Sequence, residues 1–249
     1  MQKTLLLLLF FSITLSCQPQ KEGLLIATAA NMQFVMKELT QVFEAETSIP
    51  CQVSISSSGK LTAQIKEGAP FDIFLSADMK FPQELQENKL SLSEPSIYAY
   101  GELVLWGMGK IPPSIENLSD EKVKHIALAN PKTAPYGSAA EAVLMHFSLL
   151  EKVKDKLVFG ESIAQTNQFI STGAAEMGFT AKSVVVSPQI LGKGKWIAID
   201  PSLYPPIAQG IVLLKNGKAS KEQAQKFYDF LFSAKGKEIL NKFGYSVDN

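Results

Sequence analysis

Three short segments of the sequence have residue types that could bind an anion. They are residues 29–31 (AAN), 56–59 (SSSG) and 135–138 (PYGS). Each stands where a predicted helix begins, and there the unpaired backbone N–H groups and the positive end of the helix dipole favour negative charge. Ordinary helix capping explains any one segment by itself, because Ser and Asn often precede helices. Lys60, directly after the second segment, could add charge to an anion site or could be a solvated surface lysine.

The composition limits how this chain could bind a charged partner. Lys and Arg together number 24, as do Asp and Glu, so the formal net charge is zero and a nucleic-acid partner is not supported. All of the basic residues are lysine, which excludes a bidentate arginine clamp on a carboxylate or phosphate. With two cysteines and two histidines, we expect no His/Cys metal cage within the chain. Because the sequence contains no cofactor motif, we also expect no bound cofactor.

Catalytic motifs give little support for an enzyme. The sequence contains no G-x-S-x-G, P-loop or H-E-x-x-H pattern. His125, in a predicted strand, and His146, in a predicted helix, are interpreted as structural. Asp72 and Asp78 bracket another predicted strand, and either could act as a general base. An exported hydrolase that uses one of them is therefore an alternative, although capping and loop hydrogen bonds are the simpler interpretation.

The N-terminus predicts export. Lys3 precedes an apolar run that starts at Leu5 and continues to Leu15, and Ser16 follows, so residues 1–16 are predicted to be a signal peptide. Cys17 follows as in the lipobox of bacterial lipoproteins, which predicts its lipidation, with 17–22 as a tether; ordinary secretion and an uncleaved anchor are the alternatives. No later apolar run reaches about 18 residues. We therefore expect an exported, periplasmic protein that touches the membrane only through a lipid anchor.

Beyond residue 22, predicted strands alternate with predicted helices. Strands are expected at 23–29, 52–56, 71–75, 97–106, 125–129, 157–159, 175–181, 195–199 and 207–214. Helices are expected at 31–46 with Asn31 as N-cap, 61–68, 80–88, 137–150, 162–171, 219–233 and 235–243. The alternation predicts an α/β fold with mostly parallel sheets flanked by helices. Cys51, at the start of the second strand, is expected to be a buried residue outside any disulfide.

Two runs of such units in one chain of this length indicate two lobes. The stretches 97–106 and 204–213 are candidate crossovers, so we expect lobe 1 to comprise 23–102 and 208–249 and lobe 2 to comprise 103–207. Ligands of such sheets bind beyond the carboxyl ends of the strands, where the three candidate segments lie.

Several segments together resemble the periplasmic molybdate-binding proteins, the substrate-binding components of molybdate ABC transporters. They are 27–31 (ATAAN), 56–78 (SSSGKLTAQIKEGAPFDIFLSAD), 129–144, 160–179, and the closing FYDFL and FGY. They occur in the same order over about residues 22 to 247, which is far more specific than any single motif. The resemblance implies a two-lobed, type II periplasmic-binding-protein fold with two crossover strands, acting as a monomer.

The resemblance also implies a ligand and its site. A tetrahedral molybdate or tungstate dianion would be held through its oxygens, in a cleft that closes between the lobes, by neutral hydrogen-bond donors. The matching positions are Ala30, Asn31, Ser58, Tyr136 and, through a backbone donor, Ile163. Some members have a tyrosine where this chain has Ala181, so one hydroxyl donor is lacking here. The closed, loaded form would be presented to an ABC transporter permease.

The chemistry of the candidate segments agrees with an anionic ligand. A fully deprotonated oxyanion has only acceptors, and no Asp or Glu stands beside Asn31, Ser58 or Tyr136. A binding protein for sulfate or another oxyanion is the main alternative, besides the exported hydrolase and a surface adhesion or structural protein. The sequence does not rank molybdate against tungstate.

Overall fold

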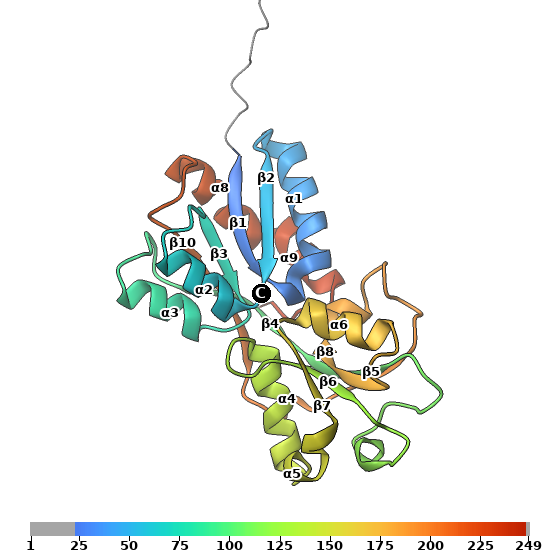
Figure 1. The fold of residues 1–249 in the computed structure, drawn as a ribbon. Helices are drawn as coiled ribbons and strands as arrows, with labels where there is room; N and C mark the ends of the chain where they lie inside the picture. The colour runs from blue at the N-terminus through green and yellow to red at the C-terminus, as the bar shows by residue number, and fades with distance from the viewer. Residues whose placement is uncertain (1–22, 248–249) are drawn as a thin grey trace, which may run out of the picture.

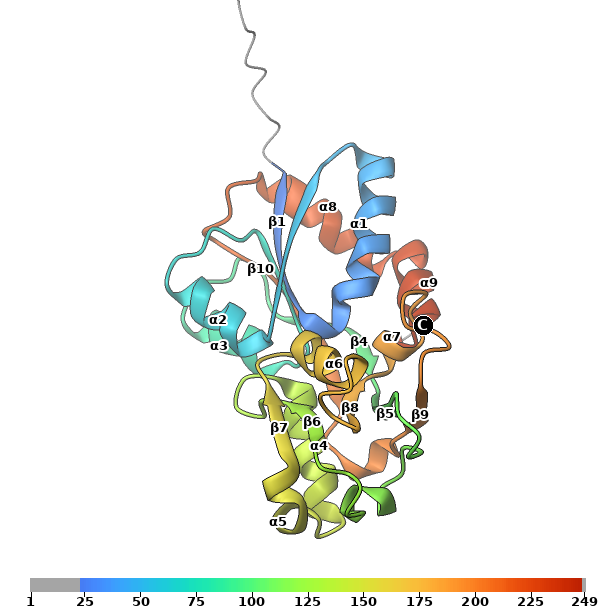
Figure 2. The same cartoon turned by 45° about the vertical axis from the view of Figure 1, so that its right-hand side comes forward.

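The computed structural model describes residues 23–247 and has two lobes, each built on a five-stranded sheet (Figures 1 and 2). The predicted signal peptide, tether and lipidation site at Cys17 lie outside the described residues. Within the described part of the chain, no helix has the length and apolar character needed to cross a bilayer.

The sheet of lobe 1 has the strand order β2-β1-β3-β10-β4. Its strands are β1 (Leu24–Ala29), β2 (Cys51–Ser56), β3 (Ile73–Ser76), β4 (Ser96–Gly101) and β10 (Ile207–Leu213). β1 pairs in parallel with β2 and β3, whereas β10 is antiparallel to both β3 and β4. The sheet is therefore mixed, with every strand except β10 running in one direction, which agrees with the predicted mostly parallel sheet.

The sheet of lobe 2 repeats this arrangement in the order β7-β6-β8-β5-β9. Its strands are β5 (Leu103–Gly107), β6 (Ile126–Ala129), β7 (Leu157–Gly160), β8 (Met177–Ala181) and β9 (Lys195–Ala198). Here β5 is the reversed strand, antiparallel to β8 and β9. The reversed strand of each sheet is the one that follows a crossing between the lobes, because it enters its sheet from the other lobe.

Helices cover both faces of each sheet (Figure 1). Lobe 1 carries η1 (Ala30–Met32), α1 (Gln33–Thr47), α2 (Ser58–Lys66), α3 (Lys80–Glu87), α8 (Lys221–Phe232) and α9 (Ala234–Lys242). Lobe 2 carries η2 (Glu116–Ser119), α4 (Pro135–His146), α5 (Leu150–Val153), η3 (Lys154–Lys156), α6 (Ile163–Ser171), α7 (Lys182–Val185) and η4 (Pro201–Leu203).

The alternation of side chains along the strands explains this layering. In β1, Leu24 and Ile26 pack in the core beneath α1, α8 and α9, whereas Ala27 faces the core beneath α2 and α3. In lobe 2, Leu103 and Leu105 of β5 face the core beneath α4, and the alternate residues of β5 face the core beneath α6. A strand covered on both faces is apolar throughout, which is why β1 and β5 read as continuous hydrophobic runs.

The predicted strand 97–106 is two strands in different sheets. β4 ends at Gly101, Glu102 joins the lobes, and β5 begins at Leu103. The close packing at this crossing requires glycine, because a β-carbon on Gly101 would lie 2.1 Å from the hydroxyl oxygen of Tyr136. An ion pair stabilises the same crossing, since the ammonium group of Lys182 lies 2.9 Å from the Glu102 carboxylate. The second crossing leads from η4 through Pro205 and Pro206 into β10.

Three local predictions were wrong. The helix predicted over 137–150 ends at His146, because Ser148 adopts a left-handed conformation (φ 52°), and Phe147, beyond the helix end, is 40% exposed. Asn31 is not an N-cap but lies inside η1, with its side chain hydrogen-bonded within the core. His125 does not lie inside a strand but is exposed and immediately precedes β6.

Cys51 begins β2 and is half-buried rather than fully buried. It is a free cysteine. Burial, followed by the nearby negative charge of Glu44, raises the pKa of its thiol to about 12, so the group stays protonated at neutral pH. The side chain is therefore a poor nucleophile.

Candidate functional site

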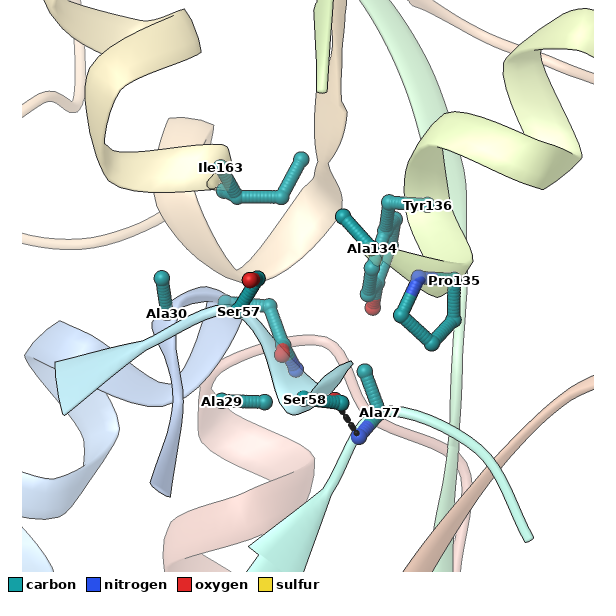
Figure 3. A pocket seen from close by; sticks show the side chains of 10 residues that line it. Ala29, Ala30, Ser57, Ser58, Ala77, Ala134, Pro135, Tyr136 and Ile163 are labelled. Carbon is teal, nitrogen blue, oxygen red and sulfur yellow. Dashed lines mark hydrogen bonds between the residues drawn. The ribbon is translucent and has the colours of Figure 1, made fainter. Parts of the chain in front are cut away.

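A small cavity lies between the two lobes and brings together all five predicted site residues (Figure 3). Its lining residues are Ala29, Ala30, Asn31, Ser57, Ser58, Ala77, Ala134, Pro135, Tyr136 and Ile163. The first and last of these residues in the sequence, Ala29 and Ile163, are 134 positions apart. None of the lining side chains carries a formal charge.

Helix N-termini from both lobes form the wall of this cavity. Lobe 1 contributes Ala30 and Asn31 in η1, which leads into α1, and Ser58, the first residue of α2. Lobe 2 contributes Tyr136 near the start of α4 and Ile163, the first residue of α6. The first N–H groups of a helix have no partner within it, and they carry the positive end of its dipole. Backbone donors from both lobes therefore lie at the cavity.

Ser58 is oriented as a donor. Its hydroxyl oxygen accepts a hydrogen bond of 3.0 Å from the backbone N–H of Ala77, in the loop after β3, which is drawn as a dashed line in Figure 3. The side chain is fully buried. Because a hydroxyl has one hydrogen and the Ala77 N–H approaches the oxygen, the hydrogen of Ser58 remains to be donated to a ligand.

Asn31 differs from Ser58 because its side chain is already used. Its amide nitrogen donates to Gln209 Oε1 over 2.8 Å and to the Tyr245 hydroxyl over 2.7 Å. Both amide hydrogens are thus bonded within lobe 1. The donor that Asn31 can offer to the cavity is its backbone N–H, not its side chain.

Tyr136 also offers its backbone rather than its side chain. Pro135 has no N–H group, so the N–H of Tyr136 is the first of α4. The ring is buried, and its hydroxyl approaches Gly101 at the crossing between the lobes. Burial, and then the neighbouring Tyr245, raises the pKa of the Tyr136 hydroxyl well above its usual range, so the ring is neutral.

An ion pair joins segments of both lobes beside the cavity. Lys60, two residues after Ser58, forms a 2.5 Å ion pair with Glu161, which precedes α6. Both side chains are exposed and belong to different lobes, so Lys60 bridges the rim and does not line the cavity. Within residues 23–247 there is no group of three or more His, Cys, Asp or Glu side chains that could hold a metal ion.

The two candidate bases lie elsewhere. Asp72 is buried and accepts hydrogen bonds from the N–H groups of Leu25 (2.6 Å) and Ala219 (2.9 Å), which is a structural role. Asp78 accepts from the N–H of Phe81 at the start of α3 and lines a neighbouring cavity. Neither lines the cavity at the helix N-termini.

The sequence of this chain is similar to those of known solute-binding proteins. A family model described as "Bacterial extracellular solute-binding protein" matches residues 24–246. The chain belongs to this family. A molybdate-binding protein ModA of Azotobacter vinelandii is 39% identical over 236 residues, covering 94% of this chain and 93% of that protein. A molybdate-binding protein ModA of Rhodobacter capsulatus is 36% identical over 226 residues, covering 89% of this chain and 87% of that protein.

The solved structure of the Azotobacter vinelandii periplasmic molybdate-binding protein has the same fold. It superposes with a TM-score of 0.86 at 32% sequence identity, covering 91% of this chain and 100% of that chain. The predicted α/β fold with two lobes is thereby confirmed, as is the predicted membership of a family of solute-binding proteins.

In this solute-binding protein the two lobes are in contact beside the cavity. The N–H of Gly59 donates to the carbonyl oxygen of Thr133 over 2.9 Å. A second interlobe hydrogen bond runs from the Ser183 hydroxyl of α7 to the carbonyl oxygen of Asn31 over 2.9 Å. Hydrogen bonds that join the lobes are formed only when the lobes approach, so they favour the closed arrangement.

Two further positions, Ser57 and Ala181, were not among the five predicted site residues. Ser57 lines the cavity, although only its neighbour Ser58 had been assigned to the ligand. Its burial was not visible in the sequence; the run of three serines was the only signal. Ala181, where some family members have a tyrosine, ends β8 opposite Leu103 and is not among the lining residues.

Proposed function

We propose that this protein binds molybdate, or the similar tungstate, in the interlobe cavity and delivers it to the permease of an ABC transporter. One observation carries the proposal: helix N-termini from both lobes meet at a buried cavity whose lining residues are all uncharged. The names of two relatives, both at least 36% identical, supply the identity of the oxyanion.

The proposed donors are the backbone N–H groups of Ala30, Asn31, Tyr136 and Ile163 and the hydroxyl of Ser58. A doubly charged tetrahedral oxyanion accepts hydrogen bonds and donates none, so it matches a wall made of donors. Neutral N–H groups and helix dipoles can disperse its charge without an opposite charge in the cavity. A carboxylate in the lining would repel the dianion, and the lining has none.

Closure follows from the division of donors between the lobes. Ala30, Asn31 and Ser58 stand on lobe 1, whereas Tyr136 and Ile163 stand on lobe 2. An anion bound to one lobe of an open form reaches only part of the set, and closure adds the rest. The ligand therefore binds the closed form more tightly and shifts the population toward it.

The rest of the assignment is proposed with this function. Residues 23–102 and 208–249 would form lobe 1, and 103–207 would form lobe 2. Residues 1–16 would direct export to the periplasm, and Cys17 would carry the lipid that tethers a monomer to the membrane. The protein would bind and release its ligand without catalysing a reaction, and without a cofactor.

Isothermal titration of the purified protein with molybdate, tungstate and sulfate tests the proposal. We expect tight binding of the first two and weak or no binding of sulfate, and we expect Ser58→Ala to weaken binding roughly 10- to 100-fold, because it removes a hydrogen bond to a charged group. If sulfate binds as tightly as molybdate, the proposal of an oxyanion site stands but the proposed specificity for molybdate is wrong. A folded protein that gives no heat with any of the three would refute the proposal.

A further inference from the structure

We propose that the hydroxyl of Ser57 is an additional direct hydrogen-bond donor to the bound oxyanion. This inference rests on the proposed function, because it names a further contact in the same cavity. It concerns a residue that lies in the resembling segment 56–78 but is not among the five predicted site residues.

The backbone at Ser57 explains why its side chain is not used as a helix cap. Ser57 is the N-cap of α2, with φ −72° and ψ 151°, but its hydroxyl makes no capping hydrogen bond. A serine at this position ordinarily accepts from the second or third N–H of the helix. Here the second N–H, that of Gly59, donates across the cleft to Thr133. The interlobe contact thus takes a usual partner of the serine side chain.

The hydroxyl of Ser57 is buried without a partner. The residue is 3% exposed, and its oxygen has no hydrogen-bond partner within the described protein. Burial of an unpaired hydroxyl is unfavourable, and such groups are rare in folded proteins. In Figure 3 the Ser57 hydroxyl projects into the space between Ile163 and Ser58.

The surroundings of this hydroxyl indicate what would satisfy it. The helix N-termini around the cavity present N–H groups, and the Ser58 hydroxyl is already oriented by Ala77. A ligand that brings only acceptors would pair with all of these donors and with the hydrogen of Ser57. No hydrogen bond fixes the orientation of the Ser57 hydroxyl, so its hydrogen can turn toward the nearest oxygen of a tetrahedral anion.

The experiment compares Ser57→Ala with Thr28→Val. Thr28, in β1, is fully buried and its hydroxyl also has no partner, but it does not line the cavity. We expect Ser57→Ala to weaken molybdate binding roughly 10- to 100-fold in isothermal titration, and Thr28→Val to change it by less than about 3-fold. In the absence of molybdate, the melting temperature of Ser57→Ala should equal or exceed that of the wild type, because the variant loses an unpaired buried hydroxyl.

The outcomes separate this inference from the proposed function. If the wild type binds no oxyanion, the proposed function fails. If the wild type binds molybdate and folded Ser57→Ala binds it equally well, the role of Ser57 is refuted while the function stands. Equal losses of affinity in the two variants would also refute it, because they would show an effect of buried hydroxyls in general.

Discussion

The backbone N–H of Gly59, on lobe 1, lies 2.9 Å from the carbonyl oxygen of Thr133, on lobe 2. A β-carbon at position 59 would lie 3.0 Å from the α-carbon of Thr133 and 3.0 Å from the ring of Phe81. The two lobes therefore meet here backbone to backbone, next to the cavity, and the closed form has no room for a side chain at this position.

Gly59→Ala should weaken ligand binding by hindering closure. Crowding of this kind costs about 1–3 kcal/mol, which corresponds to roughly 5- to 100-fold in affinity. In the open form only the contact with Phe81, which is also on lobe 1, would remain, and the helix preference of alanine over glycine, about 1 kcal/mol, would offset it. We therefore expect lower molybdate affinity in isothermal titration together with an unchanged or higher melting temperature without ligand.

Gly109→Ala is the matched control for this variant. Gly109 is exposed in lobe 2, and a β-carbon there would meet no atom within 4 Å. It should bind molybdate like the wild type. Wild-type affinity in Gly59→Ala as well would mean that the ligand-bound form does not require the Gly59–Thr133 approach.

The Lys60–Glu161 ion pair should make a small and salt-sensitive contribution to closure. Exposed ion pairs contribute roughly 0.2–1 kcal/mol, so loss of either partner should weaken binding by at most about 5-fold. The two changes should act oppositely on association, since Lys60→Ala removes an attractive charge from the rim and Glu161→Gln removes a repulsive one. Both should accelerate release, as stopped-flow measurement at low and high salt can establish.

Lys66→Ala provides the control for the ion pair. Lys66 has the same side-chain exposure as Lys60, 42%, and pairs with Glu84 over 2.8 Å within lobe 1. Because this pair does not join the lobes, its loss should leave the release rate unchanged. Equal acceleration by Lys66→Ala and Lys60→Ala would contradict a specific role for the interlobe pair.

The sequence could predict the segments that line the cavity, because the start of a helix is a local feature of the sequence. Ser58 and Tyr136 each follow a recognisable break and open a helix, and helices after strands of one sheet begin at the same edge. The apolar run 23–29 likewise indicated a strand, which the structure has as β1. The order of elements and the chemistry of the junctions therefore indicated the candidate segments, and the resemblance to the molybdate-binding proteins named the five residues. That both lobes bring these residues to one cavity is known only from the fold.

The sequence could not predict which polar atoms are already occupied. The Asn31 side chain is bonded to Gln209 and Tyr245, which are 178 and 214 positions away along the chain. The Ser57 hydroxyl is unpaired partly because Gly59 donates to Thr133, on the opposite lobe. Such pairings depend on long-range packing, so they distinguish backbone from side-chain donors only once the fold is known.

Tyr136→Phe should retain the affinity of the wild type to within about 3-fold. The proposed donor is the backbone N–H at this position, whereas the hydroxyl approaches Gly101. Tyr136→Ala should instead lower the free energy of unfolding by about 3–5 kcal/mol, because it removes a large buried ring. Isothermal titration and urea denaturation distinguish the two effects; a large loss of affinity in a stable Tyr136→Phe would identify the hydroxyl as a ligand donor.

The Asp78 carboxyl should make the stability of the protein depend on pH. Burial raises its pKa above the ordinary value of 3.8, although hydrogen bonds from Phe81 and Ser76 and the charge of Lys80 oppose this. The folded state therefore binds more protons than the unfolded state between the two pKa values. It follows that the contribution of Asp78 is most favourable below pH 3.8 and is lost as the pH rises through the raised pKa.

Asp78→Asn should remove this dependence. The amide cannot ionise, and its oxygen can still accept from the N–H of Phe81, so the variant should gain stability relative to the wild type as the pH rises from below 3.8 toward neutrality. Urea denaturation at both ends of that range measures the difference, with Asp155→Asn, at an exposed position of lobe 2, as the control. A constant difference between Asp78→Asn and the wild type would show that the carboxyl has the same pKa in the folded and unfolded states, and so that its burial beside the crossing into β10 imposes no electrostatic penalty.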